Sequence, residues 1–324
     1  MFRSRRALAA FLLSLIAPFA TAKTSLQASS AGPSQDYLVY VVCESADKVV
    51  LLRFGPHGFH EEHETHIGLL PVDINGPHGI AVSPDKQFVY VSVGHGRPDG
   101  SAWKLKAGTE EVVQYTPLGL FPATADISQD GEFLYVANAN FHGDMVPSSI
   151  SVVATGALLE VKRITTCTMP HGSRLSPDGT KHYSACMMDD MLAEIDTQKF
   201  AVSRYFMLSV GKEMGMPGAP QSQMKMGDLT CVPTWAQPSN DGSEIYVACN
   251  KANDIVVVDT ILENDQAIPR RQRRLQPGDD QGWPPGRHQQ ARPVGFRLRS
   301  EVRKRTCAPA HQAQGGPRRS GHAG

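Results

Sequence analysis

The alternation of hydrophobic and polar residues along this chain predicts β-strands that fold back through tight turns. In four places a β-rich stretch reaches an Asp-Gly turn or a relative of it, and a second β-rich stretch follows directly. Glycine accepts the positive φ of a tight hairpin turn, and aspartate bonds to its own backbone there, so each pattern predicts an antiparallel hairpin. The four stretches are GIAVSPDKQFVYVSVGHG from Gly79, ADISQDGEFLYVANAN from Ala125, SRLSPDGTKHYSACMMDD from Ser173 and AQPSNDGSEIYVACNKANDIVVVD from Ala236.

These hairpins recur at a nearly regular spacing. The turn aspartates Asp85, Asp130, Asp178 and Asp241 lie 45, 48 and 63 residues apart, and the last gap contains an insertion around 211–228. Sheets that repeat every 40–45 residues or so, without helical periodicity between them, are typical of propeller blades stacked around a channel. We therefore predict an all-β fold, a β-propeller of four-stranded antiparallel blades. About five blades are expected in residues 37–268, as an incomplete ring truncated from a larger one.

The second strand of most repeats carries a common motif, which reads YVSV at Tyr90, YVAN at Tyr135 and YVAC at Tyr246. Over residues 37–260 these repeats resemble the YVTN-family β-propeller repeat. Relatives of that family include the haem-carrying propeller of cytochrome-type nitrite reductases, surface-layer propellers and propeller lactonases. The resemblance implies the fold, but it does not select a function, because the same architecture serves binding modules and enzymes alike.

The beginning of the chain reads as an export signal over residues 1–22. Arg3, Arg5 and Arg6 supply a basic start, an apolar stretch follows, and Ala20-Thr21-Ala22 is a small-residue cleavage site. We expect a periplasmic or secreted product without a membrane span after cleavage. With 41% hydrophobic and 20% charged residues, the chain has enough apolar material for a substantial core.

Residues 269–324 form a basic tail rich in Arg, Pro and Gly, which we predict to be disordered. The tail contains 13 Lys and Arg against 3 Asp and Glu, and the rest of the chain contains 19 against 29. Such an asymmetry is typical of nucleic-acid or membrane binding. However, GC-rich codons can be chosen for residues 270–323 that encode a further blade, in phase with the repeat, when read one base out of frame. We therefore interpret the tail as a frameshift product and expect no nucleic-acid partner.

Pro-His-Gly precedes the first strand of two repeats and places His78 and His171 at equivalent positions. The first strand of a propeller blade lines the channel, so we predict that the two imidazoles lie at one rim. Imidazole is a common metal ligand, which makes both residues candidates for binding a cofactor or metal, with haem iron and copper as the options. The alternative is that the motif only shapes the start of a loop.

Four cysteines also occupy repeated positions. Cys167 and Cys231 precede a first strand, whereas Cys186 and Cys249 end the second strand of the same blades. Antiparallel pairing brings these ends together, so we predict disulfides Cys167–Cys186 and Cys231–Cys249 in an oxidising compartment. Buried free thiols and metal ligands are the alternatives. Cys43 has no evident partner, and Cys307 lies in the tail.

Methionine is concentrated in one region, with nine of the eleven residues between Met169 and Met226. The insertion carries two Met-x-Met pairs, and thioethers are soft ligands that suit Cu(I). We therefore name Met214, Met216, Met224 and Met226 as candidate metal ligands that face the rim with the histidines. The alternative is an adaptable contact surface or lid. A His/Glu-rich stretch, HGFHEEHETH from His57, predicts a solvated loop between blades, with a divalent-ion site as the alternative.

Taken together, these patterns favour a periplasmic or secreted propeller that presents a rim site to a small molecule, a cofactor or a periplasmic protein partner. One alternative is a haem- or copper-dependent redox protein. A second is a hydrolase similar to the propeller lactonases, for which the sequence assigns no catalytic residue. The chain contains no glycine-rich phosphate loop, Gly-x-Ser-x-Gly elbow or His-Glu-x-x-His helix.

Overall fold

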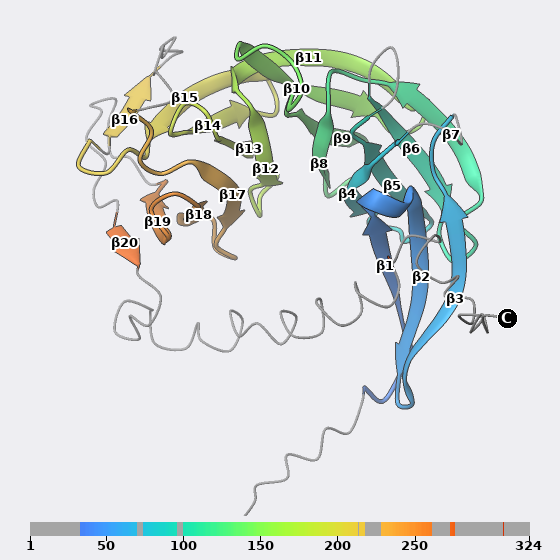
Figure 1. Cartoon of the computed structure of the whole chain (residues 1–324). Coiled ribbons are helices and arrows are strands. Elements are labelled where there is room, and N and C mark those ends of the chain that lie inside the picture. The colour runs from blue at the N-terminus through green and yellow to red at the C-terminus, as the bar shows by residue number, and fades with distance from the viewer. Residues whose placement is uncertain are drawn as a thin grey trace, which may run out of the picture.

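Five antiparallel sheets make up most of the described part of the chain, which comprises residues 33–69, 74–95, 100–212, 214–217, 228–260, 273–275 and 307 of a computed structural model. The sheets follow one another in chain order around an arc, which we number blades 1 to 5 (Figure 1). The first strands of blades 2 to 5 lie on the inner side of the arc, and those of neighbouring blades in this group contact each other. This arrangement confirms the predicted all-β propeller.

The blades contain between three and five strands, each paired antiparallel with its neighbour. Blade 1 comprises β1 (Tyr37–Cys43), β2 (Lys48–Gly55) and β3 (Gly58–His66), with a short 3₁₀ helix at Glu44–Ala46. Blade 2 comprises β4 (Pro77–Val82), β5 (Phe88–Val93), β6 (Ser101–Lys106) and β7 (Val112–Pro117). Blade 3 comprises β8 (Pro122–Ile127), β9 (Phe133–Asn138), β10 (Pro147–Ala154) and β11 (Leu159–Thr168). Blade 4 comprises β12 (Pro170–Leu175), β13 (Lys181–Cys186), β14 (Met191–Asp196), β15 (Ala201–Met207) and β16 (Met214–Pro217). Blade 5 comprises β17 (Pro233–Pro238), β18 (Glu244–Cys249), β19 (Asp254–Asp259) and β20 (Arg273–Leu275).

A Ser-x-Asp turn joins the first two strands of blades 2 to 5. In each turn the serine hydroxyl donates to the aspartate, with Oγ to Oδ1 distances of 2.5–2.6 Å, and it accepts the N–H of the residue five positions later. The residue after the aspartate takes a positive φ, which is why glycine follows in three of the four turns and Lys86 is strained in the other. The four pairs are Ser83–Asp85, Ser128–Asp130, Ser176–Asp178 and Ser239–Asp241.

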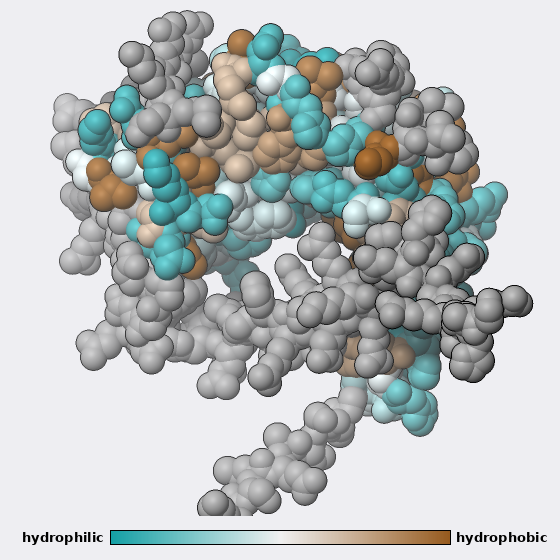
Figure 2. Space-filling model, viewed as in Figure 1, coloured by the Kyte–Doolittle hydropathy of each residue, from teal (hydrophilic) through white to brown (hydrophobic). Residues whose placement is uncertain are grey.

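The hydrophobic core lies between adjacent blades. Tyr90 of blade 2 packs against Leu134 and Val136 of blade 3, and similar clusters join the other neighbouring pairs. Each blade therefore buries its faces against its neighbours, as stacked propeller sheets do. In the view of Figure 2, hydrophilic and hydrophobic residues are interspersed over the described surface, without one dominant apolar patch.

Two sequence interpretations change at the ends of the arc. The prediction of a loop for the stretch HGFHEEHETH is wrong, because residues 58–66 form the exposed edge strand β3. This strand pairs with β2 and forms the ion pairs Glu64–Lys48 and Glu62–Arg53 with it. The predicted tail contributes β20, which pairs with β19, and one disulfide-bonded cysteine. The predicted signal, residues 1–22, and the rest of the tail lie outside the described residues. No helix in the described part is long and apolar enough to cross a membrane.

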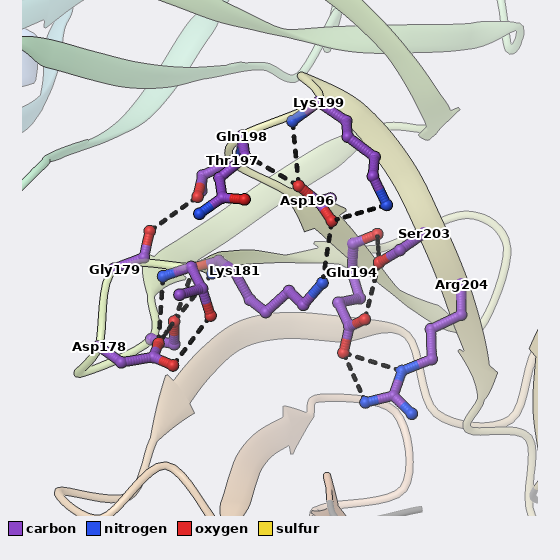
Figure 3. A network of polar contacts seen from close by, with 12 residues as sticks. Asp178, Gly179, Lys181, Glu194, Asp196, Thr197, Gln198, Lys199, Ser203 and Arg204 are labelled. Atoms are coloured by element: carbon purple, nitrogen blue, oxygen red, sulfur yellow. Dashed lines mark hydrogen bonds and ion pairs between the residues drawn. The ribbon is translucent and has the colours of Figure 1, made fainter. Parts of the chain in front are cut away.

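Blade 4 carries a polar network along its outer strands (Figure 3). At its exposed side Asp196 accepts the backbone N–H groups of Gln198 and Lys199 and pairs with the Lys181 and Lys199 ammonium groups at 3.3 and 3.6 Å. At its buried side the Glu194 carboxylate pairs with the Arg204 guanidinium at 2.7 Å. The network thus contains two ion pairs on Asp196 and a more deeply buried one between Glu194 and Arg204, all in the same sheet.

We expect Arg204→Ala to lower the free energy of unfolding by about 3 kcal/mol, because it leaves the buried Glu194 carboxylate without its partner. The guanidinium also donates to the carbonyl of Thr260 in blade 5, so the variant loses a contact between blades as well. Lys199→Ala is the matched control and should change the free energy by less than about 1 kcal/mol, since exposed ion pairs contribute little. Urea unfolding of both variants makes the comparison, and equal effects contradict it.

The His182 imidazole lies between blades 3 and 4, fully buried and stacked on Tyr135 at a centroid distance of 5.0 Å. Among the described residues neither of its ring nitrogens has a hydrogen-bond partner. Burial lowers the pKa of His182 from its usual 6.5 to about 3. Below pH 6.5 the unfolded chain therefore takes up a proton that the folded chain does not accept until about pH 3, so this residue makes the protein less stable as the pH falls through that range.

We expect His182→Phe to raise the free energy of unfolding by about 1 kcal/mol at pH 7, because phenylalanine keeps the stacking and removes the unpaired polar atoms. The gain should grow as the pH falls from 6.5 toward 3. Urea unfolding measured at several pH values tests this, and a gain that is independent of pH contradicts the burial of a neutral imidazole.

Candidate functional site

The Pro-His-Gly motifs start the inner strands β4 and β12, and their glycines allow neighbouring inner strands to approach closely. A Cβ on Gly172 would lie 2.4 Å from the carbonyl oxygen of Thr234 in blade 5, and one on Gly79 would lie 2.3 Å from that of Ala123 in blade 3. Both glycines are therefore required by packing. The packing of each glycine fixes the position of its strand. The histidine directly before the glycine is therefore held at the beginning of that strand.

The structure brings His78 and His171 together across the arc, although blade 3 lies between them in sequence. Their Nε2 atoms are 3.3 Å apart. Each ring is also held through its other nitrogen: His171 Nδ1 is 2.9 Å from the carbonyl oxygen of Thr234, and His78 Nδ1 is 3.3 Å from Oε1 of Glu44. The side chains of Glu44, His78 and His171 thus form one continuous chain of polar contacts.

The partners determine which nitrogens carry hydrogen. The Thr234 carbonyl oxygen only accepts, so His171 Nδ1 carries the hydrogen and Nε2 is the acceptor atom of the neutral ring. The matching tautomer of a neutral His78 carries its hydrogen on Nε2 and donates it to His171 Nε2 across the 3.3 Å contact.

Aromatic rings surround the histidine pair. Phe121 contacts the His78 ring at a centroid distance of 5.6 Å, Phe141 contacts the His171 ring at 5.4 Å, and the two phenylalanines meet at 4.7 Å. Burial lowers the pKa of His171, and the nearby His78 lowers it further, although the contact with the Thr234 carbonyl opposes both. The result is a partly desolvated imidazole next to an apolar wall.

Two carboxylates, the buried Asp190 and the half-buried Asp47, hold the segments that lead into this site. Asp47 accepts the N–H of Gly76, directly before Pro77-His78, at 2.8 Å. Asp190 accepts the N–H of Val232, directly before Pro233-Thr234, at 2.7 Å. Gly76 and Val232 both have a positive φ, 61° and 50° respectively, which valine adopts only under strain. The rim conformation is therefore imposed by contacts between blades.

Met214, a predicted metal ligand, lies far from the histidines. It stands on β16, the outer edge of the sheet in which β12 is the inner strand, and at about 4.8 Å per strand the separation is about 19 Å. At that separation Met214 does not share a metal ion with the histidines of β4 and β12, and its role as a metal ligand stays a prediction. The side chains of Met216, Met224 and Met226 lie outside the described part. The methionines near the aromatic wall are instead Met169, Met187 and Met188.

All six cysteines are disulfide-bonded. Cys167 pairs with Cys186 and Cys231 with Cys249, the two pairs anticipated from the strand ends. Cys43, which had no evident partner in the sequence, pairs with Cys307. Three disulfides fit an oxidising compartment.

The distance between the two imidazole nitrogens tests haem as a candidate cofactor. Two imidazoles on opposite faces of one haem iron would place their nitrogens about 4 Å apart, at metal–nitrogen distances near 2 Å. The 3.3 Å separation is too short for that arrangement. Among the described residues no group of three or more His, Cys, Asp and Glu side chains is placed to hold a metal ion.

Several rim residues were not found by the sequence analysis. They are Glu44, which follows β1, His95, which follows β5, and Phe141 and His142, which follow β9. His95 stacks on His142 at 5.0 Å and contacts Phe121. The place directly after the second strand of a blade is the signal that could have found His95, Phe141 and His142, because these loops reach the same face.

The described fold defines the protein as a β-propeller. Residues 31–180 match the family model described as "Lactonase, 7-bladed beta-propeller". None of the curated proteins matches the chain.

Solved propellers resemble the structure at low sequence identity. A periplasmic gluconolactonase from Pseudomonas aeruginosa is 16% identical with a TM-score of 0.54, covering 76% of this chain and 70% of its own. A putative 6-phosphogluconolactonase from Bacteroides fragilis is 13% identical with a TM-score of 0.54, covering 74% and 67%. A functionally unknown protein from Desulfotomaculum acetoxidans is 11% identical with a TM-score of 0.52, covering 73% and 69%. These likenesses establish the fold alone.

We expect Cys231→Ala combined with Cys249→Ala to lower the free energy of unfolding by about 3 kcal/mol, the value for a cross-link that closes a loop of this length. Their sequence separation is 18 residues. Urea unfolding of the double variant measures the loss. Alkylation of the unfolded wild-type protein without reductant should leave both cysteines unlabelled, and labelling of either one contradicts the pairing.

Proposed function

We propose that this chain is an extracytoplasmic propeller hydrolase that opens a lactone ring at the mouth of its channel. The observation that carries the proposal is the contact series Glu44–His78–His171, in which a carboxylate orients one imidazole and that imidazole faces a second. An acid–base pair of side chains, one of them held by an orienting carboxylate, is a recurring arrangement of hydrolytic sites. The lactonase family match over residues 31–180 and the similarity to a gluconolactonase and a putative 6-phosphogluconolactonase support the same class.

His171 is the general base of this proposal. Its Nδ1–H donates to the Thr234 carbonyl, which leaves Nε2, 3.3 Å from His78 Nε2, as the atom that accepts a proton. A water molecule bound to Nε2 gives up its proton as it attacks the lactone carbonyl carbon. Burial favours the neutral, basic form of the ring, since desolvation disfavours the charged one.

His78 supplies the proton in this proposal. Held by Glu44, it carries hydrogen on Nδ1, and in its doubly protonated form it also presents Nε2–H to the carbonyl oxygen on which negative charge develops. The ring oxygen leaves as an alcohol after it receives a proton, so one water and one lactone give one hydroxy acid. Phe121 and Phe141 exclude bulk water from one side of the pair.

A second candidate is a binding protein that holds a small molecule at the rim without turnover. The observation that favours it is the aromatic wall, because flat apolar rings beside a few fixed polar groups are typical of ligand pockets. His78 and His171 then serve as hydrogen-bonding groups. The YVTN-type relationship of the repeats, a haem- or copper-dependent redox role and a periplasmic protein partner stay predictions from the sequence.

An extracytoplasmic location is part of the proposal. Three disulfides join strand ends and rim loops, and such bonds persist in oxidising compartments rather than in the cytosol. The predicted export signal over residues 1–22 agrees with that location, as does the periplasmic gluconolactonase among the similar structures.

The test is hydrolysis of glucono-1,5-lactone by the full chain, followed with a pH indicator and corrected for the spontaneous reaction. We expect His171→Ala to lower kcat/KM by roughly 10²–10⁴-fold, the contribution of a general base. His57→Ala, which removes an exposed histidine far from the rim, is the matched control and should retain full activity. Undiminished turnover in His171→Ala contradicts the mechanism. Saturable lactone binding without turnover by the wild-type chain selects the binding candidate instead.

A further inference from the structure

An arginine and a tryptophan stack on each other between the inner strands of blades 4 and 5. The central carbon of the Arg174 guanidinium lies 4.5 Å from the centroid of the Trp235 ring. Arg174 stands on β12 and Trp235 on β17, two neighbouring strands on the inner side of the arc (Figure 1). Both residues are partly buried and partly open to solvent. Stacking on an indole face orients a guanidinium and leaves its in-plane N–H groups available to a ligand.

The positive charge of Arg174 has no ion-pair partner within the described part of the chain. Its one hydrogen bond there runs from Nη1 to the carbonyl oxygen of Ser173 at 2.8 Å, although a guanidinium carries five N–H groups. The Asp126 carboxylate instead accepts the backbone N–H groups of Ile127 and Leu175. Burial lowers the pKa of Arg174, and the charge of Asp126 opposes this shift. A guanidinium taken out of water in this way costs free energy that a bound anion would offset.

The place of Arg174 in its repeat does not call for an arginine. Arg174 lies four residues before the turn aspartate Asp178. The equivalent residues of blades 2, 3 and 5 are Ala81, Asp126 and Gln237. Those three blades form the same antiparallel sheet with an uncharged or a negative side chain at this position. The arginine of blade 4 therefore indicates a local role and not a requirement of the fold.

Trp235 adds a second hydrogen-bond donor to the guanidinium. Its indole N–H has no hydrogen-bond partner among the described residues, and it is not a fully buried atom. Guanidinium and indole groups only donate, so together they select a ligand that accepts hydrogen bonds. We infer that Arg174 and Trp235 bind one oxyanion group, a carboxylate or a phosphate, between the inner strands of blades 4 and 5. Arginine recognises both groups through paired, charge-assisted hydrogen bonds.

This oxyanion site is separate from the histidine pair at the rim. Arg174 follows His171 by three residues on β12, which places about 10 Å of strand between them. The site uses neither of the two imidazoles and needs no turnover. An oxyanion can therefore bind here whether or not the rim opens a lactone.

The test titrates the full chain with sodium phosphate and, separately, with sodium acetate at pH 7 and constant ionic strength. Tryptophan fluorescence follows binding, because the guanidinium that holds the anion lies against the Trp235 ring. We expect a saturable change with at least one of the two anions, and the anion that binds more tightly distinguishes a phosphate from a carboxylate site. Arg174→Gln should weaken binding roughly 10–100-fold, the effect of losing charge-assisted hydrogen bonds.

Arg163→Gln is the matched control. It removes an arginine from the outer strand β11, where the guanidinium pairs with Glu160 at 2.7 Å, so this variant should bind the anion like the wild-type chain. Arg174→Lys keeps the charge without the planar fork and should bind with intermediate affinity. Unchanged binding by Arg174→Gln, or equal losses in the two glutamine variants, overturns the inference.

The titration of the wild-type chain does not depend on the folding of any variant. No saturable response to either anion also overturns the inference. Neither anion is a lactone or the product of one in the hydrolysis assay, so the two experiments succeed or fail independently.

Discussion

The close approach of neighbouring inner strands is the constraint on which the rest of the structure depends. Gly79 and Gly172 have no room for a side chain, because the carbonyl groups of the next blade occupy that space. This contact sets the distance between neighbouring blades. It also places the Thr234 carbonyl group within hydrogen-bonding distance of the His171 ring. The same close packing that assembles the arc therefore orients the candidate site.

The rim holds two imidazoles in a rigid frame. Carboxylates accept hydrogen bonds from the segments that precede the inner strands, and strained residues such as Val232 have positive φ values there. The Nε2 atoms of His78 and His171 lie 3.3 Å apart inside this frame. The hydrolytic proposal depends on this fixed geometry.

The fold could be predicted from the sequence because each repeat consists of short, local sequence patterns. Ser-x-Asp turns, the glycines after them and the alternating strands each act over a few residues, so a single sequence is enough to recognise them. The disulfide pairs within blades 4 and 5 followed from the same strand ends. The pairing of Cys43 with Cys307 did not, since 264 residues separate them and no local pattern connects them.

The sequence by itself determined the sheets, their turns and the placement of His78 and His171 at the start of inner strands. Only the tertiary structure decided that these rings meet across an intervening blade, that Glu44 and Thr234 orient them, and that Met214 lies on an outer edge instead. The reason is physical: strand periodicity says which residues share an end of a sheet, whereas distances across the arc depend on how tightly the blades pack.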